Sequence, residues 1–492
     1  MSEISDFGLI LLILAGGFSL ALMAIRFTSW FPVPAPALFL LGAAVVSDLF
    51  PDLQEDVSIR TVERIAVVAL IVILFHGGMH IGWRRFRGAA LPVVLLGTVG
   101  TFATAGVITV AARLLLDVDW TTAGLIGAAL APTDPAVTFS VLGQKEIVGR
   151  TGTILEGESG MNDPVGIALM IGIIELADHP DATFSVVVEE FAVEMAVGLV
   201  VGIAGGLLLG QVIRRFSLPS EGLYPLRTLA AAGLIYGAAS IAQGSGFLAV
   251  FVAGILIGDA RAPFKAEIER FHNALASLAE IAVFVALGIT LDLTDVITSS
   301  TLWEGIVLAL VLAFVARPLA ISPLLARTRL RRGEQLFVMW GGLKGAVPIL
   351  LGALAVLANV DDARRIYELI FVVVAFSVLV QGSTIPRAAR RLGVRMRARR
   401  PEPWRLSIDL PKEPGDLHRH RVRAGSHAAG RKIKDLPLGE YGWIVTIVRD
   451  GQVVRPGGSS ELKVGDEVVV AAESRDARGV RRIFEGSGPP RV

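Results

Sequence analysis

The stretch GESGMNDP, residues 157–164, decides how this chain is interpreted, because it places two carboxylates, a hydroxyl and an amide inside an apolar segment. In a helix, Glu158 and Asn162 lie on one face. The same four-residue spacing relates Ser159 to Asp163, so all four side chains share that face. An ionisable residue at membrane depth costs about 3 kcal/mol and usually marks an ion or proton path. The stretch therefore predicts a cation site; a buried network that only holds helices together is the alternative.

The composition indicates a membrane protein. Of 492 residues, 53% are hydrophobic and 18% are charged, whereas a soluble domain has about 25% charged residues. The chain has no cysteine, which excludes disulfides and thiolate metal sites. Its net charge of +1 gives no argument for a nucleic-acid partner. The first apolar run, near residues 7–26, lacks a basic leader and a cleavage site, so we expect a retained membrane helix.

About thirteen stretches are apolar over a length that can cross a bilayer, for which about 20 residues are needed. They lie near residues 7–26, 34–50, 62–82, 90–116, 120–142, 154–176, 187–213, 223–243, 246–259, 273–291, 303–326, 335–358 and 366–386. Basic loop residues divide roughly 21 to five between alternate sides. By the positive-inside rule, the N-terminus is expected outside and the C-terminus in the cytoplasm.

Two of these spans contain helix breakers. The fifth carries APTDP at residues 131–135, and the twelfth carries WGGLKGAVP at residues 340–348. Proline lacks an N–H and clashes with the carbonyl four residues earlier, so each motif predicts an interrupted helix. Interrupted helices in the middle spans of two three-span groups, 4–6 and 11–13, are typical of a transporter site. We expect Asp134 to offset the positive helix ends there and Lys344 the negative ones.

The chain changes character after about residue 400. Short β-like runs appear near 443–448, 452–454 and 467–471, separated by Gly-rich turns. We predict a membrane domain at residues 1–390, an Arg- and Pro-rich linker at 391–413, a small α+β domain at 414–485 and a disordered tail at 486–492. Basic residues cluster at residues 418–423, where they are expected to face anionic lipid or solvent, or a nucleotide phosphate.

Three motifs taken together, TDP at 133–135, ESGMNDP at 158–164 and GGLKGAVP at 341–348, resemble the NhaP-type monovalent cation:proton antiporters. The resemblance is close for the sub-branch with a C-terminal TrkA-C (RCK C-lobe) domain, often described as potassium/proton antiporters. It implies an all-α polytopic membrane protein with about thirteen helices, an inverted-repeat fold and two discontinuous helices. It also implies a homodimer, in which a mobile core of spans 4–6 and 11–13 moves against a scaffold.

The same resemblance assigns roles to the residues of the cation and proton site. Asp163 matches the essential cation- and proton-binding carboxylate. Asn162 matches the partner amide that marks electroneutral members. The remaining matches to residues that ligate the cation are Thr133, Asp134 and Ser159.

Support or tuning of the site is expected from three further residues, Glu158, Lys344 and His76. Glu158 matches an acid that is ion-paired to a basic residue in the twelfth span, which here is Lys344 where relatives commonly have Arg. His76 stands where relatives often carry an acid, and we expect it to be hydrogen-bonded within the scaffold or to tune the pH response. Arg317 is expected to snorkel to the cytoplasmic side or to pair with Glu156.

These observations predict a secondary active transporter, not an enzyme. We expect electroneutral exchange of one K+ or Na+ for one H+ across the cell membrane, for pH, ion or volume homeostasis, with no cofactor. The expected partners are membrane lipid, a second copy of the chain, the ions, and a regulatory ligand at residues 414–485, for which a nucleotide is the candidate. A ligand-gated cation channel and a Na+-coupled solute symporter stay open as alternatives.

Overall fold

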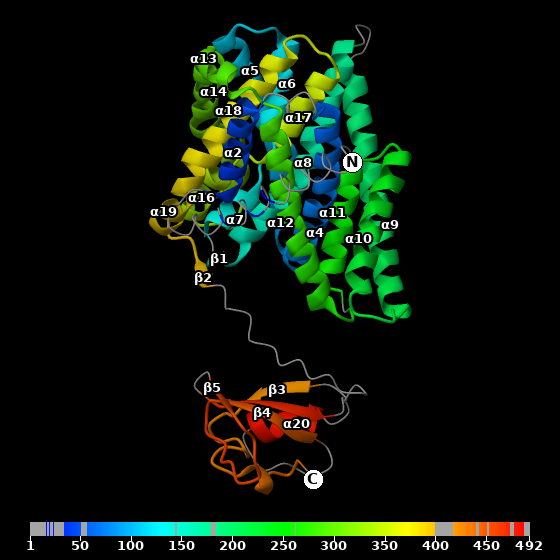
Figure 1. Cartoon of the computed structure of the whole chain (residues 1–492), viewed down its shortest axis with the longest axis vertical. Coiled ribbons are helices and arrows are strands. Elements are labelled where there is room, and N and C mark those ends of the chain that lie inside the picture. Colours follow the sequence, from blue (N-terminus) through cyan, green and yellow to red (C-terminus); the bar gives the residue numbers. More distant parts are fainter. Residues whose placement is uncertain are drawn as a thin grey trace, which may run out of the picture. The chain divides into compact units, whose positions relative to one another are not determined.

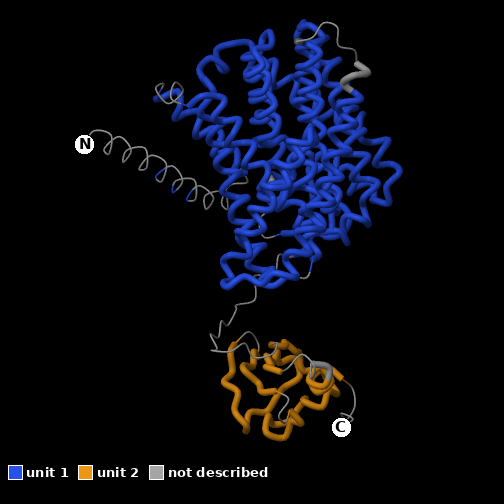
Figure 2. The backbone as a smooth tube through the Cα atoms, turned by 90° about the vertical axis from the view of Figure 1, so that its right-hand side faces the viewer, with its two compact units in different colours: residues 1–399 blue, residues 400–492 orange. Residues whose placement is uncertain are grey.

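The computed structural model describes residues 34–50, 57–142, 145–178, 184–260, 262–398, 417–438, 442–449, 452–472 and 477–486, together with the isolated positions 16, 19 and 23. The chain forms two compact units, Met1–Arg399 and Arg400–Val492 (Figure 2). The first is a helical bundle and the second a small sheet with a helix (Figure 1).

The first unit consists almost entirely of helices that run alongside one another (Figure 1). The described α-helices are α2 (Ala35–Leu49), α4 (Ile59–Leu95), α5 (Thr101–Leu116), α6 (Trp120–Leu130), α7 (Pro135–Leu142), α8 (Arg150–Asp178), α9 (Phe184–Arg215), α10 (Leu223–Ile241), α11 (Gly246–Gly258), α12 (Lys265–Ile289), α13 (Leu293–Thr298), α14 (Thr301–Val311), α15 (Arg317–Ala326), α16 (Arg332–Gly341), α17 (Ala346–Leu357), α18 (Ala363–Phe376) and α19 (Ser383–Arg391).

Each predicted span after the first overlaps one or more of these helical segments, while the first, near 7–26, lies largely outside the described residues. Among the described residues, seven helices are long and apolar enough to cross a membrane, and three shorter apolar helices accompany them. The longest stretch, Ile59–Leu116, has 58 residues and contains two predicted spans. Gly82 separates them, because its φ of 65° is a left-handed conformation that kinks α4. The total of thirteen spans stays a prediction.

Three π-helical segments interrupt the part of the bundle that the structure describes, and no sequence pattern predicted them. They are η1 (Leu96–Gly100), η2 (Leu312–Ala316) and η3 (Ser377–Gly382). Segments of this kind occur mostly as single turns inside α-helices, often at functional sites. Here η1 touches α8, η2 directly precedes Arg317, and η3 contributes Ser377 beside the break between α16 and α17.

A small antiparallel ribbon closes one end of the first unit. Strand β1 (Lys145–Ile147) pairs with β2 (Met396–Ala398). The ribbon ties the segment between α7 and α8 to the chain that follows α19. Strand β2 thus lies in the segment predicted as linker and belongs to the first unit, while the exact domain boundaries stay a prediction.

The second unit is an antiparallel sheet in the order β3-β6-β4-β5, with α20 (Ala477–Glu485) packed against it. The predicted strands are present as β4 (Gly442–Arg449), β5 (Gln452–Val454) and β6 (Glu467–Ala472). Alternate β6 residues such as Val468 and Val470 are fully buried in a core that includes Phe484 of α20. The unit therefore has a hydrophobic core of its own.

The basic cluster near residue 418 is a strand, β3 (Leu417–Arg421), which the sequence analysis missed. Because successive side chains of a strand point to opposite faces, the cluster is divided between them. His420 is buried; it stacks on Phe484, and its Nδ1 lies 3.1 Å from Glu485 Oε1. Arg419 points the other way and pairs with Glu467. The cluster is thus not a single basic surface.

Candidate functional site

The two predicted breaks are present and contact each other. Helix α6 ends at Leu130 and α7 begins at Pro135; α16 ends at Gly341 and α17 begins at Ala346. The backbone N–H of Asp134 donates to the carbonyl of Leu343 at 2.7 Å. The Thr138 hydroxyl donates to the Gly341 carbonyl at 2.9 Å. The two interrupted helices are thereby joined where their backbones leave the helical path.

Glycine at 345 permits this close approach. A methyl group at that position would overlap the Asp134 carboxylate. Gly345 is also the residue before the first turn of α17. The Asp134 carboxylate therefore lies at a helix N-terminus, where unpaired N–H groups and the helix dipole favour negative charge. This placement matches the predicted compensation of the positive helix ends.

Lys344 lies at a helix C-terminus, the end of α6. Its ammonium donates to the carbonyls of Ala131 at 2.9 Å and Pro132 at 2.7 Å, and its side chain is buried. Pro135 has no N–H for the Ala131 carbonyl, so the lysine satisfies an acceptor that the break left open. The Lys344 backbone N–H donates to Ser377 Oγ at 3.0 Å. Of the two roles predicted for Lys344, compensation of a negative helix end matches this geometry.

Asp163 lies on α8 beside the crossing of the two breaks. Its side chain is 5% exposed, and its Oδ1 has no hydrogen-bond partner among the described residues. The charged groups that act on it electrostatically are Asp134 and Lys344. The preceding amide, Asn162, donates from Nδ2 to Thr133 Oγ1 at 2.8 Å, which leaves its own Oδ1 buried without a partner in the described chain. Two buried oxygens are thus available to a ligand.

The remaining predicted cation ligands lie in the same region. Ser159 is buried on α8, one helical turn before Asp163. Thr133 is buried within the first break, and Asp134, next to it, is partly exposed. The structure therefore brings the predicted residues together at the breaks and on one side of α8. Hydroxyl, amide and carboxylate oxygens are ligands suited to a hard monovalent cation.

The predicted partner of Glu158 is wrong. Glu158 Oε1 lies 3.0 Å from the guanidinium of Arg317, and both side chains are almost fully buried. Arg317 also donates to the carbonyls of Met339 at 3.0 Å and Val338 at 3.2 Å, near the end of α16. The expectation that Arg317 snorkels or pairs with Glu156 is likewise wrong. Arg317 and Lys344 each hold the carbonyl end of one interrupted helix, and Arg317 is also the counter-ion of Glu158.

A charged residue inside an apolar span was a weak sequence signal for Arg317, but nothing in the pattern indicated which way its side chain points. The Arg317 guanidinium lies so close to Gly342 that a methyl group at residue 342 would overlap it. Two other supporting residues were missed, Ser377 and Gln381 of η3. Ser377 donates to Gln381 Oε1 at 3.2 Å, and Gln381 Nε2 donates to the Trp340 carbonyl at 2.7 Å. Small polar residues in an apolar span were the only sequence signal for this support.

His76 lies on α4, with its ring centroid 6.4 Å from that of His80. His80 Nδ1 is in turn 3.2 Å from Glu156 Oε2, so Glu156 is paired with a histidine and not with Arg317. This arrangement links α4 to α8 through titratable groups. A role of His76 in tuning the pH response stays a prediction.

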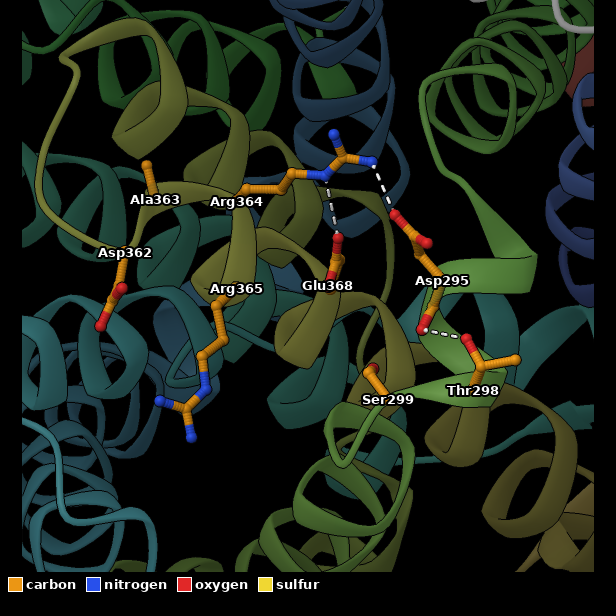
Figure 3. A pocket seen from close by; sticks show the side chains of 8 residues that line it. All are labelled: Asp295, Thr298, Ser299, Asp362, Ala363, Arg364, Arg365 and Glu368. Atoms are coloured by element: carbon orange, nitrogen blue, oxygen red, sulfur yellow. Dashed lines mark hydrogen bonds and ion pairs between the residues drawn. The ribbon is translucent and has the colours of Figure 1, made fainter.

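A separate polar recess of about 800 Å³ lies between α13 and the start of α18 (Figure 3). Its charged residues are paired: Arg364 bonds to Asp295 at 3.3 Å and to Glu368 at 3.1 Å, and Arg365 bonds to Glu304 at 3.0 Å. The recess contains none of the predicted site residues. Exposed pairs of this kind contribute little to stability, and these lie away from the breaks.

Two interrupted helices that meet inside an apolar bundle, with a buried carboxylate beside them, define a secondary active ion transporter. The chain belongs to the sodium/hydrogen exchanger (transmembrane) family, which residues 17–391 match. Residues 417–485 match the TrkA-C domain. The protein is therefore a multi-pass membrane antiporter of the cation:proton class and not an enzyme, as the sequence predicted.

Relatives of known name match both units. The K(+)/H(+) antiporter NhaP2 of Shewanella sp. (strain MR-4) is 29% identical over 459 residues, which cover 92% of this chain and 79% of that protein. The K(+)/H(+) antiporter NhaP of Alkalimonas amylolytica is 30% identical over 447 residues, covering 87% and 75%. Among solved structures, the sodium proton antiporter MjNhaP1 from Methanocaldococcus jannaschii matches with a TM-score of 0.67 at 23% identity, over 78% of this chain and 100% of that one. This last match confirms the antiporter fold.

Proposed function

We propose that the chain exchanges one K+ for one H+ across the cell membrane, with Asp163 as the residue for which the two ions compete. The observation that carries this proposal is the buried Asp163 Oδ1, which has no hydrogen-bond partner in the described chain and lies beside two joined helix breaks. A carboxylate kept from water needs either a proton or a cation close to it. The two ions therefore exclude each other from one side chain, and no ATP is required.

The cation is held, in this proposal, by oxygens that the breaks and α8 supply: Asp163, Asp134, Ser159 and Thr133, with Asn162 orienting Thr133. Its bond to Thr133 fixes the amide and turns the Asn162 carbonyl oxygen away from the hydroxyl. Asn162 carries no charge, so one site binds one proton or one cation. Exchange is then electroneutral, and an imposed voltage leaves its rate unchanged.

K+ is proposed ahead of Na+ because relatives that are similar over both units are named K(+)/H(+) antiporters. The Na(+)/H(+) antiporter NhaH of Halobacillus aidingensis matches a smaller share of this chain, 73%. The pairs that hold the breaks, Glu158–Arg317 and Lys344 with its two carbonyls, take no ion themselves. They keep the helix ends in place when the cation leaves.

The wider setting is also proposed. The positive-inside pattern favours an external N-terminus and a cytoplasmic C-terminus in the plasma membrane, and the family's architecture favours a homodimer. Residues 1–390 carry out transport and residues 414–485 regulate it through a small ligand, for which a nucleotide is the candidate. Calorimetric titration of the tail with nucleotides tests that assignment, and absence of heat for all of them contradicts it.

Asp163→Asn in proteoliposomes tests the central role. We expect dequenching of a pH dye by K+ to be lost, because the amide can neither gain a proton nor attract the cation. Asp117→Asn is the matched control, since the Asp117 side chain is 98% exposed and pairs with Arg113 four residues earlier. Both variants should elute as the wild type in size-exclusion chromatography. Substantial exchange by Asp163→Asn removes Asp163 from the central role, and cation flux without a proton gradient favours a channel instead.

A further inference from the structure

Glu280 is an acidic residue deep in α12 that the exchange described above does not use. It lies 15 residues after the first residue of the helix, Lys265, and nine before the last, Ile289. At 1.5 Å per residue it is roughly 22 Å and 14 Å from the two ends. A carboxylate at this depth requires a physical reason.

The Glu280 carboxylate is oriented inward. The side chain is partly exposed, but its Oε1 is buried and has no hydrogen-bond partner among the described residues. Helix α12 packs against α17, which begins at the second break, as well as against α2 and α4. Glu280 therefore lies on a helix outside the interrupted pair and presents an unsatisfied oxygen within the bundle.

Asp134 connects Glu280 to the exchange site. The Asp134 carboxylate lies against Gly345, the residue before α17, and both α12, which carries Glu280, and α8, which carries Asp163, pack against α17. The three carboxylates thus form a series on elements that contact α17, and Asp134 bears electrostatically on the other two. No three acidic or imidazole side chains in the described chain close around one metal position. The series is therefore a set of successive positions and not a single cage.

The buried cations of this region are already engaged. Lys344 donates to two carbonyls of the first break, and Arg317 pairs with Glu158. A mobile ion is the remaining kind of positive partner for a carboxylate beside Asp134. We propose that Glu280 is a loading position, at which the cation or proton binds transiently before it reaches Asp163; this rests on the proposed exchange function.

The loading role predicts a specific kinetic change. A negative charge near Asp134 raises the local concentration of cations, so its removal weakens capture without altering competition at Asp163. In proteoliposomes, Glu280→Gln should raise the apparent KM for K+ by about fivefold or more, while kcat stays within about twofold. Glu269→Gln is the matched control, because Glu269 is an exposed residue of the same helix that faces Lys265 at 3.7 Å. An unchanged KM in Glu280→Gln overturns the proposal.

A second measurement uses the full-length wild-type protein and does not depend on the variant folding. A hydrophobic carbodiimide labels buried protonated carboxyl groups, and mass spectrometry quantifies the label at each residue. We expect K+ to protect Glu280 from labelling, whereas choline at the same concentration does not. Equal labelling in both salts overturns the loading role. If Glu280 is protected but the wild type shows no exchange, the proposed function fails while the ion position stands.

Discussion

Replacing Arg317 with Met removes the charge that balances Glu158 while keeping a long apolar side chain. The ion pair is 3.0 Å long between side chains that are 3% and 2% exposed, so water cannot replace it. Breaking a buried pair costs about 3–5 kcal/mol. The carbonyls of Met339 and Val338 also lose their donor. We therefore expect Arg317→Met to destabilise the membrane unit by about 4 kcal/mol, which lowers Tm by about 5 °C for a unit of this size.

A double-mutant cycle in detergent, followed by thermal unfolding, identifies the partner. Glu158→Gln alone leaves Arg317 with its two carbonyls, so we expect it to cost about 2 kcal/mol. The pair Arg317→Met and Glu158→Gln contains no unbalanced charge, so it should recover about 2–3 kcal/mol relative to the sum of the single changes. Lys344→Met combined with Glu158→Gln serves as the matched comparison and should be additive within about 0.5 kcal/mol.

The opposite pattern of coupling energies would show that Arg317 is not the counter-ion of Glu158. If Glu158→Gln couples to Lys344→Met and is additive with Arg317→Met, then Lys344 is the true counter-ion. In that case the hydrogen bonds from Lys344 to the two carbonyls are not its main contribution to stability. The cycle thus decides between the pair that the sequence predicted and the pair in the structure.

Two further outcomes are expected. Gly345→Ala places a methyl group on the Asp134 carboxylate, so exchange should fall at least about tenfold while the protein still elutes as folded; wild-type activity in dye dequenching contradicts the contact. In the tail, burial opposes the charge of Asp466, but hydrogen bonds from Arg449 and from the Lys463 N–H outweigh it and lower the Asp466 pKa. A lowered pKa stabilises the fold at neutral pH, and the stabilisation is lost as pH falls through that value. Circular-dichroism melts of residues 414–486 should therefore show stability decreasing below about pH 4. Asp466→Asn should lower Tm at pH 7 by about 10 °C and flatten this dependence; an equal acid response in both proteins counts against it.

Sequence reasoning located the breaks because proline determines them by covalent geometry. Pro135 cannot donate to the Ala131 carbonyl whatever surrounds it, and the helix does stop before it. The buried residues of α8 were predictable for a similar reason, since four-residue spacing fixes which of them share a face. The bond between Asn162 and Thr133 then follows from the position of α8 beside the first break.

The partner of Glu158 was not predictable, because it depends on how separate spans are rotated about their own axes. A lysine and an arginine were both at membrane depth, and only the packed bundle determines which one faces the acid. Strand β3 was missed for a different reason. Its sequence, LHRHR, has no alternating apolar pattern, and it is a strand because β6 offers a pairing edge next to it. Long-range pairing overrides local preference there.

The π-helical segment η2 ends immediately before Arg317. A π-turn contains one residue more than an α-turn, and each residue of an α-helix advances by about 100° around the axis. In a π-turn each residue advances by less, about 80°, so the wider turn absorbs its extra residue and the helix beyond it keeps nearly the same rotation. A residue gained or lost within Leu312–Ala316 would therefore leave the Arg317 guanidinium directed at Glu158, whereas the same change in a stretch that stays α-helical would rotate it by about 100°.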